Sequence, residues 1–599
     1  MKLIAAFFAS CSLILMLPAS LFSQSVPDNW LTPCEKSGFM TTPRYAETMQ
    51  YCRRLAKAST WIKVTSFGKS AEGRDLPLVI ASKGNEFDAK KASKTKKAII
   101  LIQNGIHAGE IEGKDACLML LRDIAITKTK SSLLDHAILL IIPIYNVDGH
   151  ERFGPYNRIN QNGPREMGWR VTAQNLNLNR DYMKADAPET QAWLKMFNAW
   201  LPDFFIDCHV TDGADYQYIV TYGIETQGSV SPPVRAWIRD KYLPFLSTVM
   251  TDGVPLGPLI YFRDDLDPLK GLTGSDGTGP PRFSTVYATL QNRPGLLIEM
   301  HMLKNYKSRV RGNYTMLDST IHLVNREYKS LRQAVFMADS LAVWRRLLQN
   351  FPLEFQQDTV ANGTLHFYGN RQTNEQSEVS GATRRVYSIE HIEEEIPVFD
   401  HVKPTTTINP PIAYLIPQQW QQVIERLKMH GLHLRRLKNQ ASLQVEEYRF
   451  SDPKWAQTPF EGRHRVSYSV EKVAGRKIFP AGTIVVPLDQ RAAKVAIHAL
   501  EPEAPDAFVS WGFFDAIFEQ KEYAEDYVME TLARDMMSKN PDLKAEFDAK
   551  VRSDTAFARS PGARLNFFYQ HSPYWDSQVK LYPVARLVSN MGLNTEPVK

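Results

Sequence analysis

The stretch that decides the fold is residues 97–126, KAIILIQNGIHAGEIEGKDACLMLLRDIAI. It opens with a short apolar run rich in isoleucine, which is typical of a strand buried on both faces. After the polar segment NGIHAGE, residues 110–126 place Cys117, Leu118 and Leu121 on one face at helical spacing. The stretch therefore predicts a buried strand, a short loop and a helix.

The same alternation continues along the chain. Residues 187–201 have the pattern of a helix. A chain that alternates strands with helices builds a sheet covered by helices on both faces. We therefore predict an α/β fold for residues 24–350, with a mixed, mostly parallel twisted sheet. Further buried strands are predicted at residues 137–144, 204–208 and 295–299.

The pattern of polar and apolar residues changes after a helical run at residues 308–344. We predict a C-terminal α+β region over residues 351–599 and assign it no role from the sequence. Part of it is expected to complete the first domain. Its segments are β-leaning residues 356–395, a linker or extended edge at 404–411, strand, helix and strand over 413–437 with a break at Gly431, strands over 445–487 and a helix over 524–550.

The composition is that of a globular protein. The chain has 599 residues, of which 43% are hydrophobic and 23% charged, so a sizeable core is available. Its net charge of +6 comes from 71 basic and 65 acidic residues, and no basic block would follow a phosphate backbone. We expect no nucleic-acid partner and no stable membrane span once the N-terminal segment is removed.

Residues 1–23 have the pattern of a signal peptide. Lys2 supplies the positive charge, a mostly apolar run follows, and Ser23 is a small residue at a cleavage point that would leave Gln24 as the mature start. The protein is therefore expected to be exported, to a periplasm or to the extracellular medium. An uncleaved membrane anchor, or a lipoprotein cut just before Cys11, are the alternatives.

The other four cysteines do not form a disulfide framework or a cysteine-rich metal site. Cys34 and Cys52 are close enough in sequence to pair in an oxidising compartment. Cys117 and Cys208 sit in apolar surroundings and are expected to be buried thiols.

Three polar side chains at the ends of predicted strands have the chemistry of a metal site. His107 and Glu110 follow the first strand, and His209 follows the run at 204–208. Zinc accepts imidazole nitrogen together with carboxylate oxygen and leaves one position for water in catalytic sites. Each group alone would be a capping pair or a structural histidine, and together they predict one zinc ion. Asp207 would orient an imidazole or lie in a solvent-facing loop.

Glu299 ends another predicted strand. Burying an unpaired carboxylate is costly, so a role in proton transfer near a metal, or an ion pair with an arginine, is expected. Arg170, Asn179 and Arg180 lie in neighbouring loops, and guanidinium groups bind carboxylates bidentately or stabilise an oxyanion. The alternative for either arginine alone is an ordinary ion pair at the surface.

Taken in order, these residues resemble the zinc metallocarboxypeptidases of the carboxypeptidase A and B type. The resemblance covers about half of the chain, residues 42–344. The ordered set is far more specific than any of its members. It consists of Gly68-Lys69-Ser70 through Glu72-Gly73-Arg74, His107 with Glu110, Asn146-Val147-Asp148-Gly149, Trp169-Arg170, Asn179-Arg180, His209 and Glu299.

The resemblance implies a peptidase that removes C-terminal amino acids from peptides with a free terminal carboxylate. Zinc would activate a water molecule, and a glutamate would act as general base. The implied roles are metal ligation for His107, Glu110 and His209, general base for Glu299, oxyanion stabilisation for Arg170, and binding of the substrate carboxylate for Asn179 and Arg180.

Two other functions remain open from the sequence. One is a zinc amidohydrolase that acts on cell-wall peptides or N-acyl amino acids, and the other is a non-catalytic peptide- or glycan-binding protein on the same fold. The resemblance also implies a mobile tyrosine from a loop before Glu299. Residues 271–281 contain no tyrosine, so Tyr261, Tyr287 and Tyr306 are the candidates.

Overall fold

The computed structural model describes residues 26–274, 277–345, 349–589 and 593–598. The predicted signal peptide, residues 1–23, lies outside the described residues. Within them, the structure has no helix with the length and apolar character that a membrane crossing requires. Cys34 and Cys52 are both buried free thiols, so the disulfide considered for them is absent.

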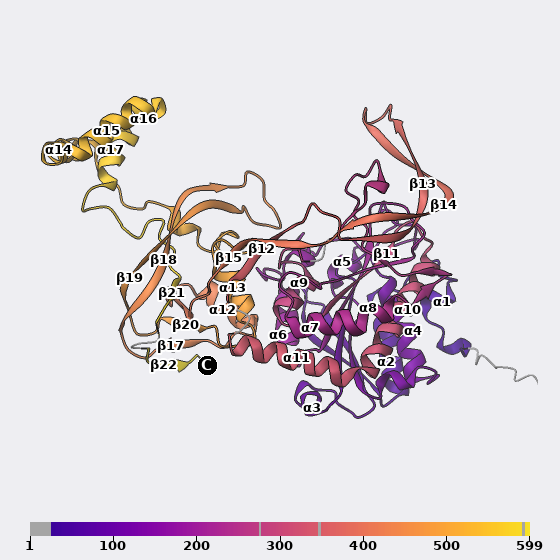
Figure 1. The fold of residues 1–599 in the computed structure, drawn as a ribbon. Coiled ribbons are helices and arrows are strands. Elements are labelled where there is room, and N and C mark those ends of the chain that lie inside the picture. The colour runs from indigo at the N-terminus through magenta and orange to yellow at the C-terminus, as the bar shows by residue number, and fades with distance from the viewer. Residues whose placement is uncertain (1–25, 275–276, 346–348, 590–592, 599) are drawn as a thin grey trace, which may run out of the picture.

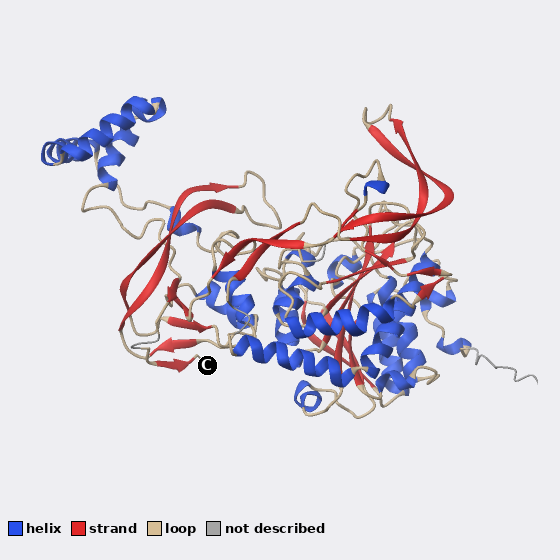
Figure 2. Ribbon diagram, viewed as in Figure 1, coloured by secondary structure: helices blue, strands red, loops and turns tan. Residues whose placement is uncertain are grey.

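An eight-stranded mixed sheet forms the centre of the N-terminal half (Figure 2). Its order is β1-β2-β4-β3-β5-β11-β6-β9, and the central strands β4, β3, β5 and β11 all run parallel. The predicted α/β sheet is confirmed. The strands are β1 Ile62–Lys69, β2 Asp75–Ala81, β3 Ala98–Asn104, β4 Ala137–Ile142, β5 Phe204–Thr211, β6 Val220–Ile224, β9 Gly257–Pro258 and β11 Gly295–His301.

Helices cover both faces of this sheet because its strands are apolar on both sides. In β3, Ile100 and Ile102 face one core while Ile99 and Leu101 face the other. The first core is closed by α2 Tyr45–Ala58, α4 Glu112–Ala125, α7 Pro232–Trp237, α8 Leu243–Leu246, α10 Tyr306–Arg326 and α11 Tyr328–Val343. On the second face lie α6 Pro188–Trp200 and α9 Ser284–Leu290.

The C-terminal region supplies the rest of the second face. Trp193 of α6 and Phe205 of β5 share one continuous core with Tyr414, Phe508 and Trp511. The predicted boundary at residue 350 follows the end of α11, yet the apolar core runs across it. The elements that contribute are α12 Gln421–Met429, α13 Ala493–Leu500 and one face of a seven-stranded antiparallel sheet.

That sheet has the order β19-β18-β21-β16-β20-β17-β22. Residues 413–437 form a strand, a helix and a strand as predicted, with Gly431 in the positive-φ region just after the helix. The strands are β16 Ala413–Ile416, β17 Arg435–Leu437, β18 Ala441–Trp455, β19 Val466–Phe479, β20 Ile484–Pro487, β21 Ala585–Leu587 and β22 Thr595–Pro597.

Two β-ribbons follow α11 in the chain, and one of them, β12–β15, runs between the two halves (Figure 1). Residues 404–411, considered as a linker or an extended edge, belong mostly to β15 Val402–Ile408, which pairs with β12 Phe351–Gln357. The ribbon of β13 Gly363–Gln376 and β14 Thr383–Phe399 stands on the N-terminal half, where β14 pairs with β10 Leu272–Thr273.

A group of four helices with its own small core stands apart from the rest of the chain (Figure 1). The single helix predicted over 524–550 is two helices here, because Pro541 begins a new one. The four are α14 Asp526–Lys539, α15 Pro541–Ser553, α16 Thr555–Arg559 and α17 Pro561–Gln570. Short elements elsewhere are α1 Pro33–Lys36, α3 Ala89–Ser93, α5 Val147–Glu151, β7 Met250–Thr251 and β8 Val254–Pro255.

Candidate metal centre

His107 and Glu110 lie in the turn that joins β3 to α4. The backbone N–H of Glu110 donates to the carbonyl of His107 at 2.9 Å, and this turn brings the two side chains to one point. Both side chains are almost completely buried, with 4% and 3% exposure. The turn therefore presents an imidazole and a carboxylate together at the carboxyl end of β3.

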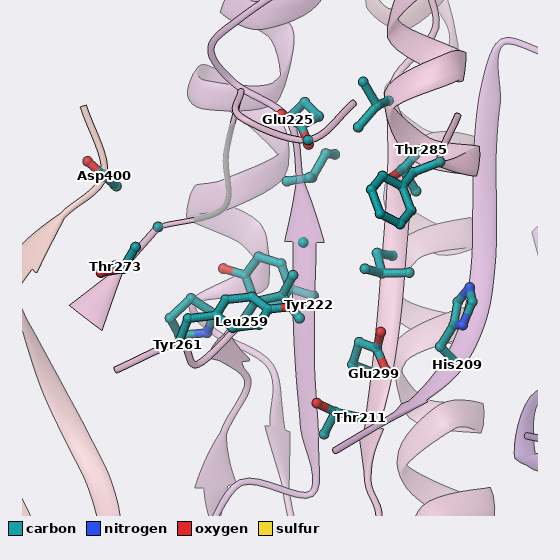
Figure 3. Close-up of a pocket in the computed structure, with 18 of the residues that line it drawn as sticks. His209, Thr211, Tyr222, Glu225, Leu259, Tyr261, Thr273, Thr285, Glu299 and Asp400 are labelled. Atoms are coloured by element: carbon teal, nitrogen blue, oxygen red, sulfur yellow. The ribbon is translucent and has the colours of Figure 1, made fainter. Parts of the chain in front are cut away.

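His209 and Glu299 reach the same point from two other strands. His209 is near the end of β5, and Glu299 pairs with it across the parallel ladder to β11. Figure 3 shows the two side chains next to each other on neighbouring strands. Because the carboxyl ends of parallel strands lie at the same edge of a sheet, side chains from three separate segments meet here.

The three predicted ligands are close enough to hold one ion. One nitrogen or oxygen atom from each of His107, Glu110 and His209 lies within 4.8 Å of the other two. Nδ1 of His107 lies 3.1 Å from Oε1 of Glu110, and Nδ1 of His209 lies 3.0 Å from Oε2. Two imidazole nitrogens and one carboxylate are a donor set that suits zinc.

The outward nitrogens of both imidazoles have partners that favour metal binding through Nδ1. Nε2 of His107 lies 3.1 Å from Oδ1 of Asn177, and Nε2 of His209 lies 3.0 Å from Oδ2 of Asp207 in an ion pair that lacks hydrogen-bond geometry. A proton held on Nε2 leaves the lone pair of Nδ1 free for a metal. Asp207 is fully buried and also accepts from Ser284 Oγ at 2.5 Å, so the solvent-facing loop considered for it is wrong.

Glu299 carries a buried carboxylate oxygen at the same edge of the sheet. Desolvation, helped by the negative charges of Glu110 and Asp212, raises the pKa of Glu299 to about 8, although His209 opposes the shift. Its buried Oε2 has no hydrogen-bond partner, and Glu299 forms no ion pair with an arginine in the described part of the chain. A buried carboxylate oxygen without a partner is costly, which fits a position beside a cation or water.

Arginines surround the carboxylate of Glu110. Nη2 of Arg158 lies 2.6 Å from its Oε1, and Nη1 of Arg170 lies 3.4 Å from the same atom. Although burial raises the pKa of Glu110, His107, Arg158 and further donors outweigh it and hold the pKa well below the ordinary value. Glu110 is therefore ionised, as a metal ligand must be.

Asn179 and Arg180 lie in the 3-10 helix Leu178–Arg180, on the wall of the same cavity. The guanidinium of Arg180 lies over the ring of Phe283, 4.3 Å from its centroid, and Nη1 donates to the carbonyl of Asn179 at 2.8 Å. Burial and the nearby charge of Arg170 lower the pKa of Arg180. A carboxylate ligand would relieve this repulsion, because it supplies the missing negative charge.

The cavity over the site has a volume of about 640 Å³ and is lined by both halves of the chain. Asn362 and Asp400 reach it from the C-terminal region, and Figure 3 shows Asp400 far from His209. Of the three candidate tyrosines, Tyr261 lines the cavity. The other two are used elsewhere, since Tyr287 bonds Nδ1 of His430 at 2.8 Å and Tyr306 donates to Asp115 at 2.6 Å.

The other matched segments form a support beneath the site. Asp148 accepts from Ser70 Oγ at 2.8 Å, from the backbone N–H of Glu72 at 3.0 Å and from Arg74 Nη1 at 2.6 Å. The segment that begins at Gly68 and the turn that contains Asp148 are thereby joined, although 74 residues separate Arg74 from Asp148. Asn146 of the same turn donates to the carbonyl of Arg170 at 3.2 Å, so this turn supports the loop that carries Arg170.

Several residues at the site were not found from the sequence. Arg158 has no local motif, and its contact with Glu110 spans 48 residues. Asn177 stands at the start of the matched Asn-Arg segment, two residues before Asn179, and that place in the motif was the available signal. Asn362 and Asp400 could not be predicted as site residues from the sequence. They lie in the C-terminal region, far along the chain from the other residues that line the cavity.

Comparisons with known proteins match the part of the chain that holds the three candidate ligands. A family model described as zinc carboxypeptidase matches residues 48–231, a span that contains all three candidate ligands and ends before Glu299. Carboxypeptidase 2 of Trichophyton rubrum is 25% identical over 511 residues, covering 78% of this chain and 84% of that protein. An alignment over 78% of the chain extends beyond residue 350, so it includes part of the C-terminal region.

Two further relatives match smaller parts. Carboxypeptidase A6 of Mus musculus is 35% identical over 102 residues, 15% of this chain and 22% of that protein. The crystal structure of carboxypeptidase A from Helicoverpa armigera aligns with a TM-score of 0.34 and 17% identity over 50% of this chain and 75% of that one. Residues 48–231 match the zinc carboxypeptidase family, and the chain is a metallocarboxypeptidase.

Proposed function

We propose that this enzyme removes the C-terminal amino acid from peptides, with one zinc ion held by His107, Glu110 and His209. The observation that carries the proposal is the meeting of these three ligand atoms within 4.8 Å, in a cavity that Glu299 and Arg180 also line. A cation site beside a carboxylate-binding arginine suits a substrate whose scissile bond is close to a free C-terminus.

Glu299 is proposed as the general base. When bound, zinc would polarise the scissile carbonyl and lower the pKa of a water molecule. Glu299 would take a proton from that water with its unpartnered Oε2 and later pass the proton to the leaving amine. Proton transfer of this kind contributes about 10²–10⁴-fold to the rate.

Arg180 and Asn179 are proposed to bind the terminal carboxylate of the substrate. Oδ1 of Asn179 already accepts from the backbone N–H of Ser284 at 2.9 Å, so its side-chain nitrogen is the group left to donate. Phe283 holds the guanidinium plane of Arg180 in place. Two donors at fixed positions would set the distance between the terminal carboxylate and the scissile bond.

Arg170 and Tyr261 are proposed to complete the site. The side chain of Arg170 is 39% exposed and lies beside Glu110, where its positive charge would stabilise an oxyanion. Tyr261 is 54% exposed, and Figure 3 shows it grouped with Tyr222 and Leu259 on the side of the cavity opposite His209. An exposed phenol at the mouth of the cavity would cover a bound substrate and donate to it.

We also propose that the enzyme is exported, because Lys2 and the apolar run that follows it have the pattern of a signal peptide. N-terminal sequencing of the secreted protein should then begin at Gln24.

The experiment compares peptides that differ only in a free or an amidated C-terminus. The zinc-loaded enzyme should release one residue from the free peptides and leave the amidated ones intact, as read by mass spectrometry. Arg180→Ala should weaken binding by about 1.5–3 kcal/mol, roughly 10–150-fold in KM, because a charged hydrogen-bond partner is lost. Arg534→Ala, on the distant helix α14, is the control. Equal cleavage of both peptide classes by the parent would rule out a carboxypeptidase.

A further inference from the structure

The turn at the end of the β18–β19 ribbon reaches from the C-terminal region to the site. Beyond the two strands, the ribbon ends in a turn that is closed by Phe460 and Arg463. Their backbone groups exchange hydrogen bonds of 2.9 and 3.2 Å. In Figure 1 this ribbon is the long hairpin of the C-terminal lobe. Between the closing residues stand Glu461 and Gly462, at the position where the ribbon meets the catalytic half.

Glu461 contacts the segment that carries the proposed carboxylate-binding pair. Its Oε2 accepts the backbone N–H of Asn177 at 2.9 Å, across 284 residues of sequence. Oδ1 of Asn177 in turn accepts from the backbone N–H of Asn179 at 3.0 Å and lies 3.1 Å from Nε2 of His107. Asn177 therefore connects Glu461, bound at its backbone N–H, with a candidate metal ligand and the 3-10 helix that ends at Arg180, both contacted by its side-chain oxygen.

Two further pairs of residues join the C-terminal region to the surroundings of Arg180. Arg463 holds Asp186 with two hydrogen bonds of 2.7 and 2.8 Å, at the far end of the segment that begins at Asn177. Asp506 accepts from the backbone N–H and from Nη1 of Arg282, at 2.9 and 2.6 Å, next to the Phe283 ring under Arg180. The C-terminal region thus bonds both ends of the segment 177–186, which contains Asn179 and Arg180. It also bonds Arg282, the neighbour of Phe283.

The backbone of the turn disfavours glutamate. Both central residues have positive φ, 50° at Glu461 and 79° at Gly462, as in a type I′ turn. Asn-Gly is the preferred pair there, and a longer side chain in the left-handed region is strained. Strain of this kind persists where surrounding contacts determine the conformation, and here the contact is the bond from Glu461 to Asn177.

We propose that Glu461 is a positioning residue of the active site, supplied by the C-terminal region. Its carboxylate fixes the main chain at Asn177, which orients His107 and sets the place of Asn179 and Arg180. The inference rests on the proposed function, because it assigns these residues to a zinc ion and to a substrate carboxylate. It gives residues 351–599 a part in substrate binding.

The test uses two substitutions with opposite effects on the contact. Glu461→Gly removes the carboxylate but suits the turn, so the Tm should stay within about 2 °C of the parent. Substrate should bind more weakly, with KM for a C-terminally free peptide raised about tenfold and kcat changed much less, because the lost interaction is made equally in ground and transition states. Zinc affinity, measured by competition with a chelator, should fall about tenfold.

Glu461→Gln retains an acceptor oxygen and should stay within about threefold of the parent in both KM and zinc affinity. Asp452→Gly is the matched control, since Asp452 is an exposed acidic residue of the same ribbon with φ of 50°. It should change neither quantity.

Parental KM and zinc affinity in Glu461→Gly would overturn the inference. A large fall in Tm in that variant would also overturn it, because the residue would then be structural, and so would a Glu461→Gln variant as impaired as Glu461→Gly. A parent enzyme that binds no zinc and cleaves no peptide would instead contradict the proposed function itself.

Discussion

The two imidazoles of the candidate metal centre differ in charge when no metal is bound. Burial lowers the pKa of His107 to about 4, so this ring is neutral at pH 7. Burial also lowers the pKa of His209, but Asp207 and Glu110 outweigh it and the net pKa lies well above the ordinary value. The pKa of Glu299 is raised to about 8, so this carboxyl group is mostly protonated at pH 7.

Zinc binding at pH 7 should therefore release protons from His209 and from Glu299. A cation disfavours the protonated imidazolium and stabilises the ionised carboxylate, so both pKa values fall when it binds. One pH unit below a pKa of about 8, roughly nine-tenths of the Glu299 carboxyl groups carry a proton. Glu299→Gln should release about one proton fewer per zinc, as measured by calorimetry in buffers of different ionisation enthalpy.

The difference should vanish above about pH 9, where Glu299 is ionised before zinc arrives. Asp400→Asn, in the same cavity but far from the ligands, is the control and should release as many protons as the parent. Equal release from the parent and Glu299→Gln at pH 7 would show that Glu299 is ionised already or lies too far from the metal to respond.

At the scale of single residues, the sequence predicts those site residues that belong to local motifs. His107 and Glu110 stand three apart after a strand, and this spacing is visible in the chain. The partners of the ligands could not be predicted, because Asn177 and Arg158 reach the site through contacts that span 70 and 48 residues.

At the scale of elements, the close approach of α4 to β5 determines where the turn of His107 and Glu110 lies. A Cβ atom at Gly113 would lie 2.2 Å from Oδ1 of Asn104 and 2.6 Å from Cβ of Cys208. No real side chain tolerates such distances, so glycine at the second position of α4 allows the helix to rest on the strand.

Gly113→Ala should destabilise the protein by about 1–3 kcal/mol, the usual cost of overpacking a core. In an exposed helix the same change stabilises by up to about 1 kcal/mol. Gly562→Ala provides that comparison, since Gly562 is the second residue of α17 and a Cβ there meets nothing within 4 Å. Urea denaturation measures both. If the two variants were equally stable, the close packing of α4 on β5 would be contradicted.

Apolar runs predicted the strands of the central sheet closely, because strands buried on both faces leave a continuous signal. The run predicted over 97–103 is β3 Ala98–Asn104, and that over 295–299 is part of β11. The helical run over 308–344 is broken at Glu327, where neither glycine nor proline marks a break. Pairing between distant ribbons was beyond prediction, since register depends on contacts that no local pattern encodes.

At the scale of the whole molecule, the second face of the central sheet depends on the C-terminal region. Trp193 and Phe205 share a core with Tyr414, Phe508 and Trp511, which lie more than two hundred residues later. The pattern of polar and apolar residues changes near residue 350. The sequence does not show which apolar faces meet across that point.

A chain that ends at residue 350 should therefore fail to fold on its own, although it keeps every candidate catalytic residue. Removing the C-terminal half would expose the apolar surface of α6 and α9, and contiguous exposed patches of this kind drive aggregation. Size-exclusion chromatography and thermal unfolding of the truncated and full chains measure the effect. A truncated chain that is monomeric, unfolds cooperatively and binds zinc would contradict it.

The central claim is that His107, Glu110 and His209 hold one catalytic zinc ion beside Glu299. Metal analysis together with turnover tests it most directly. The parent should bind one zinc per chain, His209→Ala should lose most of that affinity, and Glu299→Gln should keep one zinc but lose nearly all turnover. Full zinc occupancy of His209→Ala at parental affinity, or near-parental turnover by zinc-loaded Glu299→Gln, would contradict the account.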